Sequence, residues 1–378
     1  MKTRAAVLGR TGWAGPFSES RPLEVVELQL DPPGPGELLV EIRAAGVCHS
    51  DLSVVDGSRQ RPVPMALGHE AAGVVEAVGV GVTDVRPGDH VILTFVPSCG
   101  MCPSCSAGRP ALCGPAAIAN ASGELRGGGF RLHRDGTDVH HHLGVSAFAD
   151  RAVVSRGSAV VVSPDLPWDV AALFGCAILT GVGSVLNVAA VRPGDSVAVF
   201  GLGAVGLAAV LGSVVASAAV IVAVDPIEHK RQLASDLGAT HVIDSDDAVA
   251  AIREITGGGA EHVIEAAGHP AALEAAYRAT GRGGKTVAAG LPHPDATLTI
   301  PAVSLAGEGR HLIGSYMGDS SPHRDIPRLI ELWRSGRLPV ERLHTGTLEL
   351  ADVNVALDLL ASGEAIRTTL RPQPASTG

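Results

Sequence analysis

The sequence predicts an α/β protein with a β-rich first half and a doubly wound parallel sheet in the second half. Three observations predict this fold class. Short apolar runs separated by Pro and Gly turns fill the first half, for example ELLVEIRAAGV, AAGVVEAVGVGV and DHVILTFV. From about Leu179 onward, strand-like and helix-like segments alternate. The glycine-rich stretch VAVFGLGAVG joins the first strand of this region to its first helix.

The elements of the second half follow one another at the spacing of βαβ units. After the glycine motif we expect the strand AVIVAVD and the amphipathic helix IEHKRQLASDLGA, which stops at Gly238. The strand HVID, a helix near DAVAAIREITGGG, the strand EHVIEAAG, another helix and the strand GKTVAAG come next. The segment RDIPRLIELWRSG predicts one more helix, and we expect the tail RPQPASTG to be frayed.

Composition and charge limit the possible partners and location. The 378 residues suffice for two domains, and the 46% hydrophobic content predicts a globular protein. The net charge of −10 argues against nucleic acid or an anionic membrane as a main partner. The apolar stretch LAAVLGSVVASAAVIVAV is interpreted as a buried helix and strand, because a glycine motif precedes it and an Asp ends it. The first residues carry no signal-peptide pattern, so we expect a cytoplasmic, reducing location.

The glycine motif predicts a dinucleotide site. Gly201, Gly203 and Gly206 match G-x-G-x-x-G between a strand and a helix, and Asp225 ends the next strand. Gly201 permits the tight turn, Gly203 lets the backbone approach a pyrophosphate, and Gly206 permits close helix packing. Asp225 would accept hydrogen bonds from ribose hydroxyls and repel a 2′-phosphate, which favours NAD over NADP. A tight turn without any ligand is the alternative interpretation.

Four of the six cysteines lie within fifteen residues. Cys99, Cys102, Cys105 and Cys113 follow the pattern C-x2-C-x2-C-x7-C, with turn-forming Gly and Pro residues between them. Thiolates at this spacing can surround a tetrahedral Zn²⁺ ion, and four protein ligands would make that zinc structural. An iron–sulfur cluster is the rival interpretation.

Cys48 lies in GVCHSDL, His69 in GHE and Cys176 in FGCAILTGVG. These motifs resemble those of the zinc-dependent medium-chain alcohol dehydrogenases, in the liver-type and glutathione-dependent formaldehyde dehydrogenase-like branch. Together with the four-cysteine lobe, the glycine fingerprint and GEAIRT near the C-terminus, they extend the resemblance over nearly the whole chain. The resemblance implies that Cys48, His69 and Cys176 hold a catalytic zinc with its fourth position open.

The resemblance also implies the architecture and the chemistry. We expect a GroES-like catalytic domain over residues 1–177, a Rossmann NAD-binding domain over 178–318, and a return to the catalytic domain over 319–378. The expected cofactors are two Zn²⁺ ions per chain and NAD. The expected activity is interconversion of a primary or secondary alcohol and its aldehyde or ketone by hydride transfer. A homodimer, or else a homotetramer, is expected.

Supporting residues follow from the same resemblance. Ser50 matches the hydroxyl that takes the substrate proton, Asp51 the carboxylate that orients His69, and Glu70 the carboxylate behind the zinc. Residues matching cofactor contacts are Thr180 and Val205 at the nicotinamide, Lys230 at the adenosine ribose and Arg367 at the pyrophosphate. Phe95 and His142 fall at positions that line the substrate pocket. The alternatives are a solvated lysine for Lys230, a surface ion pair for Arg367 and an exposed polar loop for His142.

Several positions depart from the family pattern. Ser53 replaces the histidine that ends the proton relay in many liver-type enzymes, and His49 is the candidate substitute. Ala117 replaces the arginine that binds the glutathione carboxylate, and Arg59 stands where an acidic pocket residue is found, so glutathione chemistry is not expected. FRLHRDGTDV and VDPIEHKR resemble actinobacterial-type dehydrogenases with tightly bound NAD.

Three other functions compete with this interpretation. A family member that reduces a conjugated C=C bond is disfavoured, because Ser50 and every zinc ligand are retained. A non-enzymatic zinc-lobe protein that binds DNA or a protein partner is disfavoured by the acidic charge and by the lack of a basic patch near the four cysteines. An aldehyde-dismutating member with tightly bound NAD is a further alternative.

Overall fold

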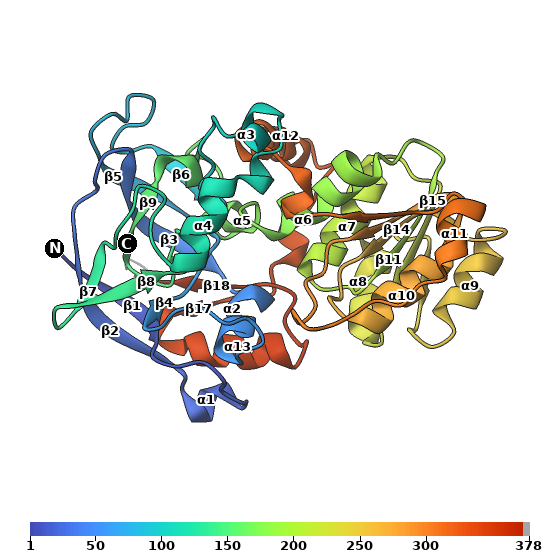
Figure 1. Cartoon of the computed structure of the whole chain (residues 1–378), viewed down its shortest axis with the longest axis horizontal. Coiled ribbons are helices and arrows are strands. Elements are labelled where there is room, and N and C mark those ends of the chain that lie inside the picture. The colour runs from blue at the N-terminus through green and yellow to red at the C-terminus, as the bar shows by residue number, and fades with distance from the viewer. Residues whose placement is uncertain (373–378) are drawn as a thin grey trace. The chain divides into compact units, whose positions relative to one another are not determined.

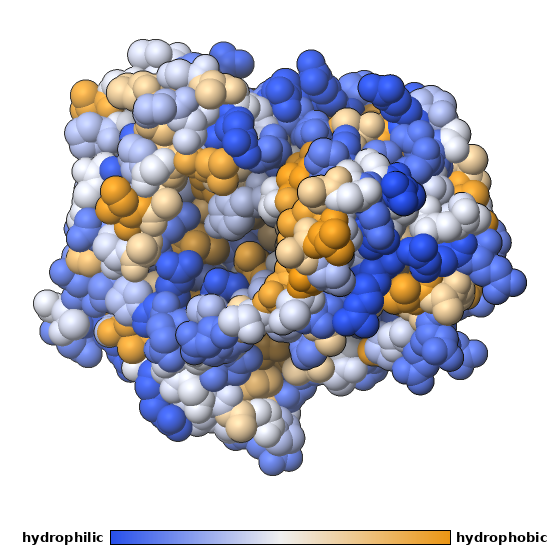
Figure 2. Space-filling view, turned by 45° about the vertical axis from the view of Figure 1, so that its right-hand side comes forward, coloured by the Kyte–Doolittle hydropathy of each residue, from blue (hydrophilic) through white to orange (hydrophobic). Residues whose placement is uncertain are grey.

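The protein's structure, a computed structural model, describes residues 1–372 and divides into two units. The first unit contains residues 1–176, 321–327 and the chain from 341 onward, and the second contains residues 177–320 and 328–340. The predicted fraying of RPQPASTG is wrong at its first residue, because Arg371 ends a strand (Thr368–Arg371) and bonds to Asp169. The part of this tail beyond Pro372 lies outside the described residues. Hydrophilic residues cover much of the face seen in Figure 2, with apolar patches between them.

The first unit is built mainly from β strands, as the Pro- and Gly-punctuated apolar runs predict (Figure 1). Its closed barrel has the order β1 (Lys2–Leu8), β2 (Leu23–Leu30), β7 (Leu132–Arg134), β8 (Thr137–His141), β4 (Met65–Ala66). A seven-stranded sheet has the order β10 (Ala159–Val162), β6 (His90–Leu93), β5 (Ala71–Val78), β3 (Glu37–Gly46), β18 (Thr368–Arg371), β17 (Gly346–Glu349), with β9 (Arg151–Ser155) also paired to β3. The last strand within the described residues, β18, therefore pairs with β3 from the first fifty residues.

Strand β3 lies at the centre of this sheet and is buried along most of its length. Leu38, Val40 and Ile42 belong to one apolar core with Phe148 and Val154. Burial of such side chains stabilises the unit by about 1.5–3 kcal/mol each. The helices of this unit are α1 (Phe17–Ser20), α2 (His49–Val55), α3 (Pro103–Ser106), α4 (Gly114–Ser122), α5 (Trp168–Leu173) and α13 (Val353–Ala361).

The second unit contains the predicted parallel sheet. The strand order is β13 (His241–Ile243), β12 (Val220–Val224), β11 (Ser196–Phe200), β14 (Ala260–Glu265), β15 (Thr280–Ala288), β16 (His311–Gly314). Numbered by appearance this order is 3-2-1-4-5-6, the order of doubly wound dinucleotide-binding sheets. Strands β11 and β12 are almost wholly buried apolar runs, because helices cover both faces of a parallel sheet.

The helices of the second unit include the predicted ones and two that the sequence analysis did not predict, α6 and α11. They are α6 (Ala177–Gly183), α7 (Ala204–Val215), α8 (Glu228–Asp236), α9 (Ala248–Ile255), α10 (Pro270–Ala279) and α11 (Ala302–Gly307). Gly238, predicted to stop α8, has a φ of 108°, a conformation that side chains rarely adopt. The long apolar stretch forms α7 and β12, and no helix within residues 1–372 is long and apolar enough to cross a membrane.

The unit boundaries differ from the predicted domains at two places. The first break falls after Cys176, one residue before the predicted end at 177. The prediction assigned all of 319–378 to the catalytic domain, whereas residues 319–320 and 328–340 belong to the second unit. The change of unit at residue 328 lies inside α12 (Pro322–Arg334), directly after Pro327, and the domain prediction did not use this proline as a boundary signal.

Candidate functional site

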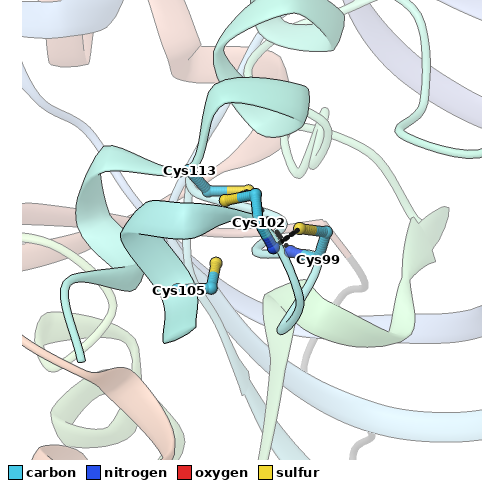
Figure 3. A group of neighbouring side chains, drawn as sticks. All are labelled: Cys99, Cys102, Cys105 and Cys113. Carbon is cyan, nitrogen blue, oxygen red and sulfur yellow. Dashed lines mark hydrogen bonds between the residues drawn. The ribbon is translucent and has the colours of Figure 1, made fainter. Parts of the chain in front are cut away.

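The four clustered cysteines come together in the loop that contains α3. Their Sγ atoms all lie within 4.8 Å of one another, and all six cysteines of the chain are free (Figure 3). The Cys102 and Cys113 Sγ atoms are 3.9 Å apart. Two sulfurs on a tetrahedral zinc with 2.3 Å bonds would be roughly 3.8 Å apart, whereas a disulfide would bring them to about 2 Å.

Backbone amides support the same arrangement. The Cys99 N–H points to the Cys113 Sγ, and the Cys102 N–H points to the Cys99 Sγ, both at 3.3 Å. A hydrogen bond from the Cys105 backbone N–H helps to lower the pKa of Cys102 to about 6. These four cysteines therefore fit a structural metal, as their spacing predicts.

The remaining two cysteines and His69 form a second cluster in the first unit. Cys48 follows β3, His69 lies between β4 and β5, and Cys176 follows α5, so three distant segments contribute. Their ligand atoms lie within 4.8 Å of one another and all three residues are buried. The His69 Nε2 atom is buried and makes no hydrogen bond, which is costly for a polar group unless a ligand occupies that side.

The two buried cysteines of this cluster influence each other's ionisation. Contact with Cys176 is the main cause that lowers the pKa of Cys48, while the same contact raises the pKa of Cys176. Two sulfurs and one imidazole nitrogen are a donor set that Zn²⁺ prefers, with one position left open.

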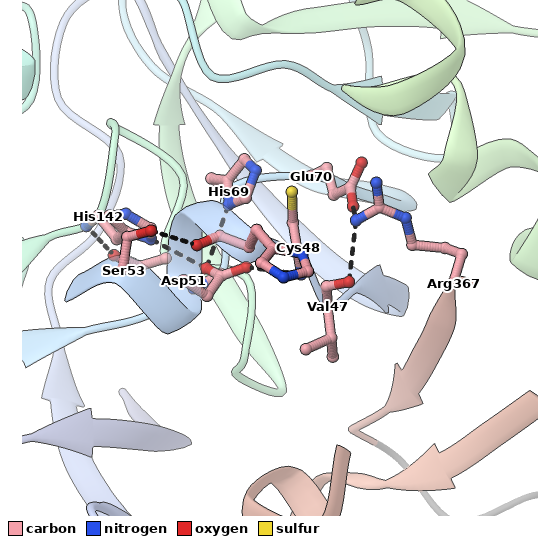
Figure 4. Close-up of polar contacts among 11 residues, drawn as sticks. Val47, Cys48, Asp51, Ser53, His69, Glu70, His142 and Arg367 are labelled. Atoms are coloured by element: carbon pink, nitrogen blue, oxygen red, sulfur yellow. Dashed lines mark hydrogen bonds and ion pairs between the residues drawn. The ribbon is translucent and has the colours of Figure 1, made fainter. Parts of the chain in front are cut away.

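Asp51 supports this cluster from α2. Its Oδ2 accepts the Cys48 N–H at 3.1 Å, and its Oδ1 lies 3.1 Å from the His69 Nδ1 (Figure 4). Burial opposes ionisation of Asp51, but the neighbouring His69 and His142 outweigh it and lower the pKa of Asp51 to about 2. The carboxylate orients His69 so that its Nε2 atom faces the two cysteines, which is the predicted role.

Glu70 and Arg367 form a buried ion pair behind the same cluster. The Arg367 Nη1 atom lies 2.7 Å from Glu70 Oε1 and also donates to the Val47 carbonyl at 2.8 Å. Burial raises the pKa of Glu70 to about 7 against the opposing effect of Arg367. The Arg367 Nε atom makes no hydrogen bond, so a donor remains for a ligand, and the contact with a pyrophosphate stays a prediction.

Phe95 and His142 also lie beside the cluster. The Phe95 ring packs edge-to-face on His69, with ring centroids 5.8 Å apart. His142, which the sequence leaves open as an exposed polar loop residue, is buried with its Nδ1 atom 3.1 Å from Asp51. That contact is not predicted from the sequence. Lining of a substrate pocket by Phe95 and His142 stays a prediction.

The residues of the predicted proton path begin α2. His49 is exposed, and Ser50 beside it is half-buried. Ser53, at the position where the resemblance expects a histidine, donates its hydroxyl to the His49 carbonyl at 2.8 Å. The Ser53 hydroxyl therefore bonds within its own helix.

The glycine motif connects β11 to α7, and each glycine faces different surroundings. A Cβ on Gly201 would lie 2.6 Å from the Ala267 N, and one on Gly206 would lie 1.8 Å from the Gly201 carbonyl oxygen. Both glycines are required by packing within the unit. A Cβ on Gly203 would meet nothing within 4 Å. Open space at the middle glycine fits the approach of a pyrophosphate.

Asp225 directly follows β12 and binds the backbone of this motif. Its Oδ2 accepts the Leu202 N–H at 2.7 Å, and its Oδ1 accepts the Ile227 N–H at 2.9 Å. The sequence predicts a ribose contact for Asp225 but not this loop contact.

The other predicted cofactor residues of the second unit are Thr180 in α6, Val205 in α7 and Lys230 in α8. Thr180 is buried, and the other two are half-buried. Their contacts stay predictions.

Comparison with known proteins shows which families, relatives and solved structures this chain resembles. Residues 34–165 match the model of the alcohol dehydrogenase GroES-like domain, and residues 204–335 match that of zinc-binding dehydrogenases. An NDMA-dependent alcohol dehydrogenase of Amycolatopsis methanolica is 39% identical, over 97% of this chain and 98% of the relative. An S-(hydroxymethyl)glutathione dehydrogenase of Escherichia coli is 37% identical, over 98% and 100%. The structure of benzyl alcohol dehydrogenase from Acinetobacter calcoaceticus is similar, with a TM-score of 0.91, 34% identity and coverage of 98% and 99%.

Proposed function

Because this chain belongs to the zinc-dependent medium-chain alcohol dehydrogenase family, we propose that it is an NAD-dependent enzyme acting on primary or secondary alcohols. It would interconvert the alcohol and its aldehyde or ketone. The predicted GroES-like and doubly wound fold is confirmed by the family models and the structural relatives. The observation that carries the proposal is the buried cluster of Cys48, His69 and Cys176 with its unbonded imidazole nitrogen.

A zinc ion held by this cluster would supply a Lewis acid that lowers the pKa of an alcohol hydroxyl. Asp51 holds the His69 ring, and the Glu70–Arg367 pair provides balanced charge behind the ligands. Because two thiolates and a neutral imidazole would balance the ion's charge, the site need not bury a net charge. We propose a second, structural zinc at the four-cysteine lobe.

A nicotinamide cofactor supplies the acceptor or donor of hydride in such enzymes. The open space at Gly203 supports a bound pyrophosphate, and the carboxylate of Asp225 supports NAD over NADP. We keep a homodimer, or else a homotetramer, as a proposal that light scattering would test.

The experiment that tests the function is absorbance at the NADH band. The purified protein is mixed with NAD and a panel of aliphatic and aromatic alcohols, and then with NADH and the matching aldehydes. Reduction of NAD by at least one alcohol is expected. Turnover only of conjugated enones with a nicotinamide cofactor would support the C=C reductase instead.

The similarity to an NDMA-dependent alcohol dehydrogenase favours a second candidate, in which NAD stays tightly bound. Such a protein would show little turnover with free NAD but would transfer electrons to an artificial acceptor. Release of about one nucleotide per chain on denaturation of the desalted protein would support it.

The exposed Ala117 and the half-buried Arg59 support independence from glutathione, so formaldehyde oxidation should not require added glutathione.

A further inference from the structure

Polar groups from three segments of the chain lie against the Asp51 carboxylate. Its Oδ1 atom accepts the Gly68 N–H at 3.2 Å and lies 3.1 Å from the Nδ1 atoms of both His69 and His142. The contact of His69 with this oxygen is a hydrogen bond, whereas the Nδ1 atom of His142 lies close to the same oxygen without making one (Figure 4). Asp51 has no exposed surface, so its charge depends on these donors.

The His142 ring also contacts the predicted zinc ligand directly. It packs edge-to-face on the His69 ring, with centroids 5.4 Å apart and planes at 77°. His142 therefore restrains both the carboxylate that orients His69 and the face of the His69 ring. A side chain in this position limits rotation of the His69 imidazole and of the Asp51 carboxylate.

The backbone holds His142 in this position. Its N–H donates to the Ser146 Oγ at 3.0 Å, and it directly follows β8, whose residue His141 pairs with Ala66 of β4. Ser146 itself has a φ of 53°, a left-handed conformation that is uncommon for serine. Ser146 is also buried, so surrounding structure maintains the turn.

We propose that His142 is a positioning residue of the Cys48–His69–Cys176 metal centre, acting through its contacts with Asp51 and the His69 ring. This inference rests on the proposed function, because it requires a metal at that cluster. Partners of a metal-bound histidine's second nitrogen commonly change metal affinity 10–100-fold when they are altered. The four-cysteine lobe does not involve Asp51, so its metal provides an internal control.

The test is the rate of zinc release to a chromogenic chelator from the full-length protein. His142→Leu removes the nitrogen and the ring, His142→Gln places an amide too far along the side chain, and His142→Asn places an amide nitrogen near the position of Nδ1. For His142→Leu and His142→Gln we expect one zinc to leave at least about tenfold faster than in the wild type. His142→Asn should remain within about threefold of the wild type.

The matched control is His140→Asn, since His140 lies in the same histidine run but bonds to the Ser122 carbonyl instead of Asp51. His140→Asn should leave the release rates of both zinc ions unchanged. If His142→Leu does not fold, the comparison of zinc release rates between His142→Gln and His142→Asn tests the proposal, because both variants keep a polar side chain. Equal release from these two variants and the wild type would overturn the proposal. A wild type that holds zinc only at the four cysteines would instead overturn the proposed function.

Discussion

Arg367 and Glu70 form an ion pair at 2.7 Å in which both side chains are almost completely buried. Arg367 comes from the residues just before the last strand, and Glu70 precedes β5. Breaking such a pair from one side leaves a buried charge without a partner. The pair therefore connects the end of the chain to the residues behind the predicted zinc ligands.

Replacing Arg367 by Met should lower the free energy of unfolding by about 3 kcal/mol near pH 8, because the Glu70 carboxylate loses its counter-charge. Urea unfolding of Arg367→Met, of Glu70→Gln and of the double variant measures the coupling free energy between the two side chains. We expect Glu70→Gln to recover at least about 1 kcal/mol in the Arg367→Met background. Strictly additive effects would show that the two side chains do not stabilise each other.

The two proposed metal sites should respond differently to loss of a cysteine. Cys176→Ser removes a ligand of the buried cluster, so the protein should stay folded, retain about one zinc and lose turnover. Cys102→Ser should instead reduce the melting temperature or the soluble yield, because the lobe depends on its metal. Metal analysis of the wild type that finds a single zinc per chain would contradict this division.

Asp225 should control both cofactor choice and the glycine loop. Asp225→Ser removes the charge that would repel a 2′-phosphate, so kcat/KM for NADP should rise relative to NAD. It also leaves the Leu202 and Ile227 amides without their acceptor, at about 1–3 kcal/mol for each donor that stays buried. Asp225→Asn keeps an acceptor oxygen and serves as the control. If the ratio of kcat/KM for NADP to that for NAD does not change in either variant, Asp225 does not determine cofactor choice.

His141 should make the protein less stable in mild acid. Burial lowers the pKa of His141 to about 3, and its Nε2 accepts the Arg131 N–H at 3.1 Å. The unfolded chain takes up a proton near pH 6.5 that the folded protein excludes, so stability is full above that pH and falls as the pH drops toward 3. The loss is about 1.4 kcal/mol for each pH unit below 6.5.

The measurement is urea unfolding of the wild type and His141→Gln at pH 7.5, 6 and 5. The glutamine variant lacks the titrating group, so the difference in stability between the two proteins should shrink as the pH falls. Parallel pH profiles for both proteins would mean that His141 does not contribute to the acid response.

The proton path can be tested at the start of α2. Ser50 can accept a substrate proton only if another group takes it further, and the adjacent His49 is exposed to solvent. Ser50→Ala should be strongly impaired at every pH. His49→Gln should lose rate mainly below neutrality, near the ordinary histidine pKa of about 6.5, with partial rescue by imidazole. An unchanged pH profile with weaker NAD affinity would identify His49 as a phosphate contact instead.

The sequence by itself determined the features that depend on local spacing. The period of the βαβ units predicts the doubly wound sheet, and the four cysteines lie so close in the chain that one loop can bring them together. The glycine motif is equally local, since packing of Gly201 and Gly206 involves the turn itself and a neighbouring strand end. Such patterns follow from backbone geometry over a few residues.

Only the tertiary structure decided how distant side chains meet. Glu70 and Arg367 are separated by 297 residues, and no periodicity in the sequence indicates that they pair. His142 reaches Asp51 because β8 pairs with β4, a strand of two residues that the apolar pattern does not reveal. The change of unit inside α12 follows Pro327, but a proline within a helical pattern does not by itself assign the two halves of the helix to different units. Contacts of this kind depend on which faces pack together, and burial then requires each polar group to find a partner there.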